Sequence, residues 1–240
     1  MNYKSSEMAC YIKNVARYFL INHFLGDCKM KKITLIFSCL AIGIAGYSIV
    51  QYLIMDAHQA GFVRMKLMFM DTLDSLWYTL LYIHVVFSIV ALVIGPFTLS
   101  SKFREKNRKC HRIAGKVYVI GILFGSIAGL YLAFYATGGF VSQLGFSLLA
   151  IFWIITGYQA VTKIKKHNVY EHQKWMIRNY SLTFAAVTLR IWLPLFTALF
   201  GFENFMISYP IISWLCWVPN LIVAQWIIGR TLQERSTIVI

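Results

Sequence analysis

Six stretches of the chain are long and apolar enough to cross the hydrocarbon core of a membrane. They cover residues 33–54, 76–99, 114–136, 141–162, 180–200 and 207–229. A helix needs about 20 residues to make that crossing. Because backbone N–H and C=O groups cannot remain unpaired in lipid, each stretch must be helical. The sequence therefore predicts an all-α fold, a polytopic transmembrane helix bundle with six spans.

The composition agrees with a membrane protein and argues against a nucleic-acid partner. Only 13% of the residues are charged and 59% are hydrophobic, whereas a soluble domain carries about 25% charged residues. The net charge of +14 would otherwise suggest nucleic-acid binding. Once the spans are removed, however, no folded domain is left outside the membrane to bind it. We expect a multi-pass protein of the cell membrane, with the lipid bilayer as its partner.

The positions of the cations predict the orientation in the membrane. All but three of the 23 Lys and Arg residues lie before the first span, at residues 102–116, at residues 163–178 or in the C-terminal tail. Cations concentrate in the cytoplasmic loops of membrane proteins, so both termini are expected in the cytoplasm. The chain then divides into a basic segment at 1–32, a transmembrane domain at 33–229 and a cytoplasmic tail at 230–240.

Two interpretations of the N-terminal segment stay open. A basic end at Met30, followed by a long apolar run, is typical of an uncleaved signal anchor, which would make Met1 a misassigned start. Alternatively, residues 1–29 form a basic interfacial helix, because their apolar residues follow helical spacing beside Lys13 and Arg17.

The cysteines and methionines do not favour a metal site. None of the five cysteines falls in a C-x-x-C pair, so neither a disulfide framework nor a thiolate metal site is expected. The outer loop at 55–75 contains His58 and four methionines, which are residue types that bind Cu(I). Methionine also fills irregular apolar surfaces. We therefore expect this loop to lie along the membrane surface.

Small residues mark one face of the third span. Gly115, Gly125 and Gly129 share this face with His111 and Tyr118, and Gly121 lies beside it. Small residues at this spacing let another helix, or a flat ligand, approach the backbone closely.

Two polar residues lie deep within the predicted spans. His84 lies on the small-residue face of the second span, so it is expected to point into the bundle, as a functional group or as a neutral imidazole bonded to a Ser, Thr or Tyr. Arg190 lies in the fifth span, and no span contains Asp or Glu. Arg190 must therefore use carbonyls and hydroxyls, reach the surface, or hold an anionic ligand. At similar depths from the outer ends of their spans, the two side chains could meet.

The fifth span carries a polar stripe. His172, Asn179, Thr183 and Arg190 fall on one face if the helix is unbroken, and the stripe is about five turns, or about 27 Å, long. Arg190 would then face the bundle interior. Asn179 and Thr183 are candidate ligand-binding residues together with His84 and Arg190.

Half of the chain resembles a known family of predicted bacterial membrane proteins, domain-of-unknown-function family 2306. The resemblance is carried by His84, by HRIAGKVY at 111–118, by TGGF at 137–140 and by EHQKWMIRNYSLTFAAVTLRIW at 171–192. It implies a family core at about residues 76–200, in which spans two to five form a four-helix core. It implies no activity.

A looser similarity is to four-helix b-type cytochromes such as cytochrome b561 and the ferric reductases. It implies one haem b, with His111 and His172 as axial ligands of its iron and Arg112 and Arg178 near its propionates. A second haem is not expected, because no histidine in the later spans lies level with His84. The alternative is that His111 and His172 are ordinary interfacial residues.

Three functions stay open. The first is a membrane redox role with one haem b, or with a quinone near His84 and Arg190. The second is a carrier or binding protein for a small anion or lipid, with Arg190 as the charge anchor and His84 as a titratable partner. The third is a structural or assembly protein, in which the polar stripe only fixes helix packing.

The orientation can be tested by labelling single cysteines in a chain whose other cysteines are replaced by serine. We expect Cys110 to react with a membrane-impermeant maleimide only after the cells are opened, because its loop is rich in cations. A Gln59→Cys variant in the first outer loop is the matched control and should react in intact cells. Reaction of Cys110 in intact cells would contradict the orientation.

Overall fold

The computed structural model describes residues 35–55, 57–70 and 72–236. The predictions on residues 1–32 lie outside the described residues. The chain divides into two compact units, Met1–Leu40 and Ala41–Ile240. Residues 35–40 are the described part of the first unit, and they are helical. All residues that line the cavity described below belong to the second unit.

The helical prediction and the six spans are confirmed. The described residues form helices and turns, with no strand among them. Six helices are long and apolar enough to cross a membrane, at Leu35–Ile54, Ser75–Leu99, Arg108–Phe134, Phe140–Lys165, Val169–Phe200 and Phe202–Arg230. Within them the elements are η1 (Val50–Ile54), α3 (Ser75–Leu99), α5 (Arg108–Phe134), α6 (Phe140–Lys165), α7 (Val169–Thr183), α8 (Ala185–Phe200), η3 (Phe202–Asn204), α9 (Phe205–Leu215) and α10 (Val218–Ser236). The connections contain η2 (Ala57–Gln59), α2 (Gly61–Leu67) and α4 (Ser101–Lys106).

Polar caps set where three of the spans begin. The side chains of Asp74, Asn107 and Asn168 each accept a hydrogen bond from the backbone N–H three residues later, at 2.8, 3.0 and 3.0 Å. These bonds satisfy N–H groups that the first turn of a helix leaves without a partner. The third span therefore begins at Arg108 and not at residue 114, where the apolar run starts.

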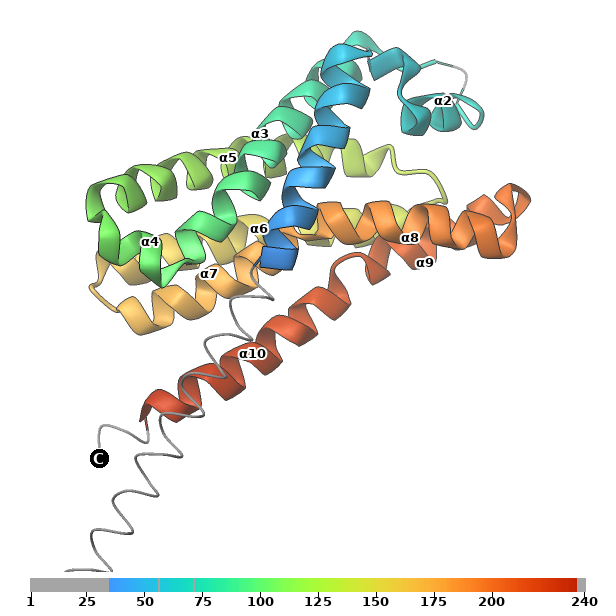
Figure 1. Ribbon diagram of the computed structural model, residues 1–240. Helices are drawn as coiled ribbons and strands as arrows, with labels where there is room; N and C mark the ends of the chain where they lie inside the picture. The colour runs from blue at the N-terminus through green and yellow to red at the C-terminus, as the bar shows by residue number, and fades with distance from the viewer. Residues whose placement is uncertain (1–34, 56, 71, 237–240) are drawn as a thin grey trace, which may run out of the picture. The chain divides into compact units, whose positions relative to one another are not determined.

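Helices α3, α5, α6 and α7 contact one another in a closed group (Figure 1). Helix α3 packs along α5, α5 against α6, and α6 against α7, which returns to α3. The glycines of α5 allow the first contact. A Cβ atom at Gly121 would lie 2.9 Å from the backbone oxygen of Phe87, and one at Gly125 would lie 3.2 Å from the hydroxyl of Ser88. The small-residue face of α5 thus packs against another helix. This was one of its two predicted uses, the other being contact with a flat ligand.

A hydrogen bond joins α3 to α7, and Pro96 and Gly95 of α3 make it possible. Pro96 has no N–H for the carbonyl of Leu92, four residues earlier in α3. The hydroxyl of Tyr180 in α7 donates to that carbonyl at 3.3 Å. The Tyr180 ring fits because Gly95 has no side chain, since a Cβ atom there would overlap the ring.

The fifth span has one irregular residue, Phe184, between two helices, although the backbone there keeps right-handed helical angles. Helix α7 ends at Thr183, and α8 begins at Ala185. The hydroxyl of Thr183 donates to the carbonyl of Asn179 at 3.1 Å, a local bond that bends helices. Beyond Phe184, α8 packs against α9. Thr183 and Arg190 nevertheless line one cavity, whereas Asn179 does not reach it.

The first outer loop folds inward, which corrects the expectation of a surface segment. Ala57, Ala60 and Val63 are fully or almost fully buried, and they pack with residues of α3 such as Trp77 and Leu81. The backbone N–H of Ala57 also donates to the hydroxyl of Tyr82 at 3.3 Å. Some side chains of this loop do remain outside, because Met68 is 70% exposed.

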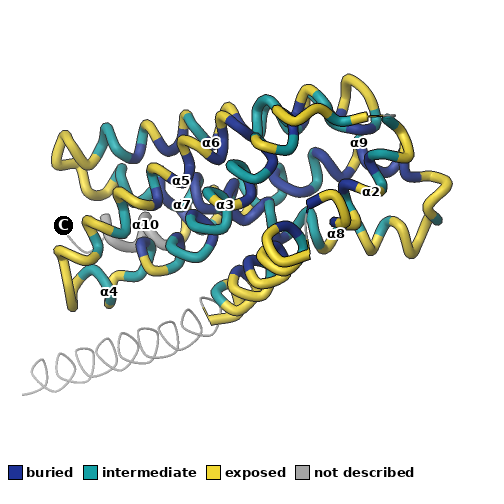
Figure 2. The backbone as a smooth tube through the Cα atoms, turned by 90° about the horizontal axis from the view of Figure 1, so that it is seen from above, coloured by how far each residue is buried: buried dark blue, intermediate teal, exposed yellow. Residues whose placement is uncertain are grey.

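Exposed residues follow the outer faces of the helices, and buried residues gather where the helices face one another (Figure 2). Many of the exposed residues are large and hydrophobic. On α5 the exposed stripe has helical spacing and consists of Ile113, Val117, Ile120, Phe124 and Ile127. It runs along the helix beside the buried glycine face. In a membrane protein such a stripe contacts lipid.

The glycine contact predicts that a Gly→Ala change stabilises the protein at one position of α5 and destabilises it at another. Gly115→Ala should raise the free energy of unfolding by up to about 1 kcal/mol, because alanine favours helix and nothing lies within 4 Å of the new atom. Gly121→Ala should lower it, because overpacking against the Phe87 backbone costs about 1–3 kcal/mol. Thermal unfolding in one detergent measures both, and equal shifts would contradict the close contact.

Candidate functional site

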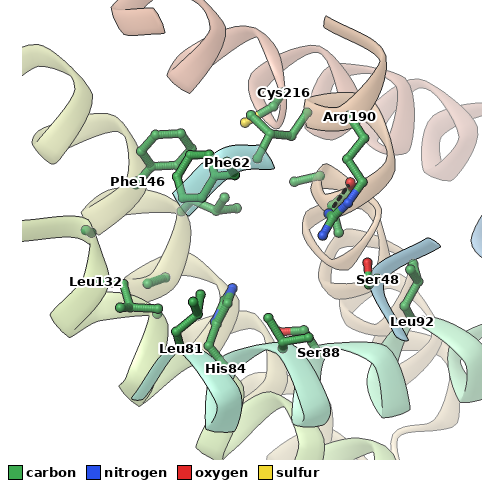
Figure 3. Close-up of a pocket in the computed structure, with 18 of the residues that line it drawn as sticks. Ser48, Phe62, Leu81, His84, Ser88, Leu92, Leu132, Phe146, Arg190 and Cys216 are labelled. Carbon is green, nitrogen blue, oxygen red and sulfur yellow. Dashed lines mark hydrogen bonds between the residues drawn. The ribbon is translucent and has the colours of Figure 1, made fainter. Parts of the chain in front are cut away.

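A cavity of about 270 Å³ lies where the first span, α2, α3, α5, α6, α7, α8 and α9 meet. Most of its wall is apolar or aromatic, with side chains such as Phe62, Leu81, Leu132, Phe146, Leu149 and Leu193. His84 and Arg190 lie on different sides of this cavity, and both point into it (Figure 3). The structure therefore brings together the two deep polar residues that the sequence singled out.

Arg190 enters the cavity from α8 as a half-buried side chain. Its Nη1 atom donates to the carbonyl of Ala186, one turn earlier in the same helix, at 2.9 Å. No Asp or Glu of the described residues lies within ion-pair distance of it, and the one ion pair described joins Lys174 to Glu171. The guanidinium has further N–H donors. These donors are available to a group inside the cavity.

His84 enters the cavity from α3 with its orientation fixed. Its Nδ1 atom lies 2.7 Å from the carbonyl oxygen of Gly125. Because a carbonyl oxygen can only accept, Nδ1 carries the hydrogen. The ring also lies against Gly129, where a Cβ atom would be 2.8 Å from Nδ1. The partner of His84 is thus a backbone carbonyl and not the predicted Ser, Thr or Tyr hydroxyl, and Nε2 keeps its lone pair.

Lys66 is a cavity residue that the sequence interpretation missed. It projects from α2, is 2% exposed, and donates from Nζ to the carbonyl of Tyr135 at the end of α5. Burial lowers the pKa of its amino group to about 8. Phe62 and Val63 precede it by four and three residues, so helical spacing in the outer loop was the available signal.

Two further polar atoms on the cavity wall have no partner among the described residues. They are the hydroxyl oxygen of Ser88, one turn after His84, and Nε1 of Trp77. Buried polar groups are almost always hydrogen-bonded in folded proteins, to protein, water or ligand. These two atoms therefore mark places where a bound molecule or water would find a partner.

Asn179 and Thr183 belong to a buried hydrogen-bond network that joins α5, α6 and α7. Asn179 uses both N–H groups of its amide, on the carbonyl of Trp153 and the hydroxyl of Thr156, each at 2.8 Å. Tyr118 donates to the amide oxygen of Asn179 at 2.8 Å and lies 3.0 Å from the hydroxyl of Thr183. Thr183 lines the cavity, whereas Asn179 is fully buried behind it with no N–H left for a ligand.

His111 and His172 lie outside this cavity. They are close enough to each other to interact electrostatically. Nδ1 of His172 donates to the carbonyl of Ala160 at 2.8 Å. Nδ1 of His111 is buried, with no partner among the described residues.

The two arginines that were predicted near the haem propionates either contact other residues or are exposed. Arg178 donates from Nε and from Nη2 to Gln225, both at 3.1 Å, and stacks over the ring of Trp175. Arg112 is exposed. Of the glycines expected to admit a porphyrin, Gly115 has nothing within 4 Å, whereas Gly121 and Gly129 lie against α3. A haem with His111 and His172 as iron ligands stays a prediction, which the reduced-minus-oxidised visible spectrum of the purified protein tests.

No group of three His, Cys, Asp or Glu that could hold a metal ion occurs in the part of the chain that the structure describes. The ring of His58 stacks on that of Tyr78, with 4.0 Å between their centroids.

The fold and the cavity together define a helical, multi-pass membrane protein with a basic intramembrane cavity. The family described as predicted membrane protein (DUF2306) matches residues 81–228, more than half of the chain, and the protein belongs to this family. No curated protein and no solved structure matches the chain. The family region contains His84 and Arg190, whereas Lys66 lies before it.

The buried hydrogen-bond network predicts how much the free energy of unfolding falls when the hydroxyl of Tyr118 is removed. Tyr118→Phe leaves the amide oxygen of Asn179 without its donor. We expect the free energy of unfolding to fall by about 1 kcal/mol, between the average for an intramembrane hydrogen bond and the cost of a buried unpaired group. Tyr158→Phe, at a side chain that is 68% exposed on α6, is the matched control and should have no effect. Equal thermal stability of the two variants would contradict the role of Tyr118.

Proposed function

We propose that the protein binds or carries an amphipathic anion, whose carboxylate or phosphate head contacts Arg190 and whose apolar body fills the cavity. The observation that carries this proposal is a guanidinium in a mostly apolar cavity with no acidic partner among the described residues. An arginine in the centre of a bilayer costs about 2.5–3.5 kcal/mol on insertion scales. A bound anion would offset that cost.

The chemistry of the site favours an acidic head group. A guanidinium binds carboxylate and phosphate oxygens through two parallel N–H donors. Its one described hydrogen bond, to Ala186, leaves N–H donors free for this purpose. The apolar wall would suit a hydrocarbon or aromatic body. The ligand is therefore proposed as a lipid-like acid and not as a small inorganic ion.

The other two functions account for less of this site. A quinone is neutral, so it would leave the charge of Arg190 without compensation. A haem between His111 and His172 would leave the cavity without a role, since neither residue lines it. In a structural role Arg190 would be expected to join helices, but its described hydrogen bond stays within its own helix.

The membrane is the proposed place of binding, with both termini in the cytoplasm. This orientation is supported by the cation-rich loops at 102–116 and 163–178. His84 and Arg190 would then lie in the outer half of the bilayer, nearer to the outer ends of the second and fifth spans (Ser75–Leu99 and Val169–Phe200). The ligand would be a component or a solute of the membrane itself.

The proposal is tested by binding of dodecanoate to the purified protein, through displacement of a dansyl-labelled fatty acid. Arg190→Leu should weaken binding by about thirtyfold or more, because losing one partner of a buried charged pair costs about 2–5 kcal/mol. Arg190→Lys should bind with intermediate affinity, since it keeps the charge but not the paired donors.

Two controls make the result specific. Arg64→Leu removes an exposed arginine of α2 and should bind like the parent protein. Acetate, which has the head group without the chain, should not displace the probe. Unchanged dodecanoate affinity in Arg190→Leu, with unchanged thermal stability, would refute the proposed function.

A further inference from the structure

We infer that His84 takes up one proton when the anion binds, so that the ligand and a proton occupy the cavity together. This inference rests on the proposed function, and it adds a coupled ion to it. The ligand would be a weak acid. His84 would hold its proton, and Arg190 would hold its anion.

First, only one nitrogen of the His84 ring is free to take up a proton. Its Nδ1–H is committed to the carbonyl of Gly125 at 2.7 Å. The ring rests on Gly129, so the contact between α3 and α5 holds it in place. Nε2 is therefore the atom that can gain a proton, and Figure 3 shows the ring projecting into the cavity that Arg190 enters from another side.

The second step is the charge of the cavity. Arg190 and His84 are within electrostatic range of each other. With no anion present, a proton on His84 would place a second cation near Arg190 in surroundings of low polarity, which is unfavourable. An anion bound between them attracts both cations. Binding of the anion and protonation of His84 therefore favour each other, as linked equilibria require.

The third step is that no other group on the cavity wall is suited to this proton. The titratable side chains that share the wall are Tyr47 and Tyr52 from the first span, Lys66 from α2, Arg190 from α8, and Tyr209 and Cys216 from α9. Arginine is protonated near neutral pH, and tyrosine and cysteine keep their protons there. Lys66, with its pKa lowered to about 8, is already mostly protonated at pH 7 and can take up only a small fraction of a proton. The wall residues of α5, α6 and α7 are not titratable, and none of the described residues that line the cavity is a carboxylate.

The proton balance is complete without any other reactant. A carboxylic acid that arrives from the membrane loses the hydrogen of its O–H bond, and a new N–H bond forms at Nε2 of His84. The carboxylate then lies between the imidazolium and the guanidinium. On release the same proton leaves with the ligand or passes to water, and no electron is transferred.

The experiment measures proton uptake when dodecanoate binds. Isothermal titration near pH 7, in buffers with different ionisation enthalpies, gives the number of protons taken up. We expect about one proton for each dodecanoate bound, and an affinity that falls up to about tenfold for each pH unit between about pH 7 and about pH 8.

His84→Gln is the variant that assigns the proton. Its side-chain amide can still donate to Gly125, but it does not titrate in this range. We expect weaker binding and, near pH 7, no more proton uptake than the small fraction that Lys66 can take. Thermal unfolding shows whether the variant is folded, and proton uptake by the unaltered protein tests the coupling even if it is not.

The outcomes separate this inference from the proposed function. Binding that requires Arg190 but takes up no proton would overturn the coupling and leave the proposed function standing. Uptake of about one proton that persists in His84→Gln would overturn the assignment to His84. Absence of any dodecanoate binding by the unaltered protein would overturn both.

Discussion

Helices α3 and α5 pack closely because glycines of α5 have only a hydrogen atom where other residues have a side chain. At Gly121 the backbone of α3 itself occupies that space, and at Gly129 the ring of His84 does so. The same contact brings the carbonyl of Gly125 within 2.7 Å of the imidazole. A larger residue on this face would separate the helices, remove the bond to His84 and change the shape of the cavity. The cavity chemistry therefore depends on a packing contact that involves no charge.

The break in the fifth span has a comparable effect on Arg190. Helix α7 is held in the four-helix group by Asn179 and Thr183, whose polar atoms are used by Tyr118, Trp153 and Thr156. Helix α8 leaves that group after Phe184 and packs on α9. One span thus contributes a satisfied polar network with its first half and an unneutralised cation with its second half. This division favours packing for Asn179 and ligand contact for Arg190.

Much of the architecture could be predicted because membranes restrict what an apolar chain can do. Backbone hydrogen bonding in lipid requires helices, so length and hydropathy were enough for the six spans. The close contact on the glycine face of α5 also followed from spacing. The inward fold of α2 did not, because its seven residues give only a short periodic pattern and Lys66 resembles an ordinary loop cation until its helical face is known.

The sequence by itself determined that the chain is a six-span helical membrane protein and that His84 and Arg190 lie deep within it without an intramembrane acid. These are properties of composition and order along the chain. Only the tertiary structure decided that the two side chains share one cavity, that His84 bonds to Gly125, and that Asn179 has no N–H left for a ligand. These facts depend on which helix faces meet and on where α7 gives way to α8. Periodicity along one helix does not specify either.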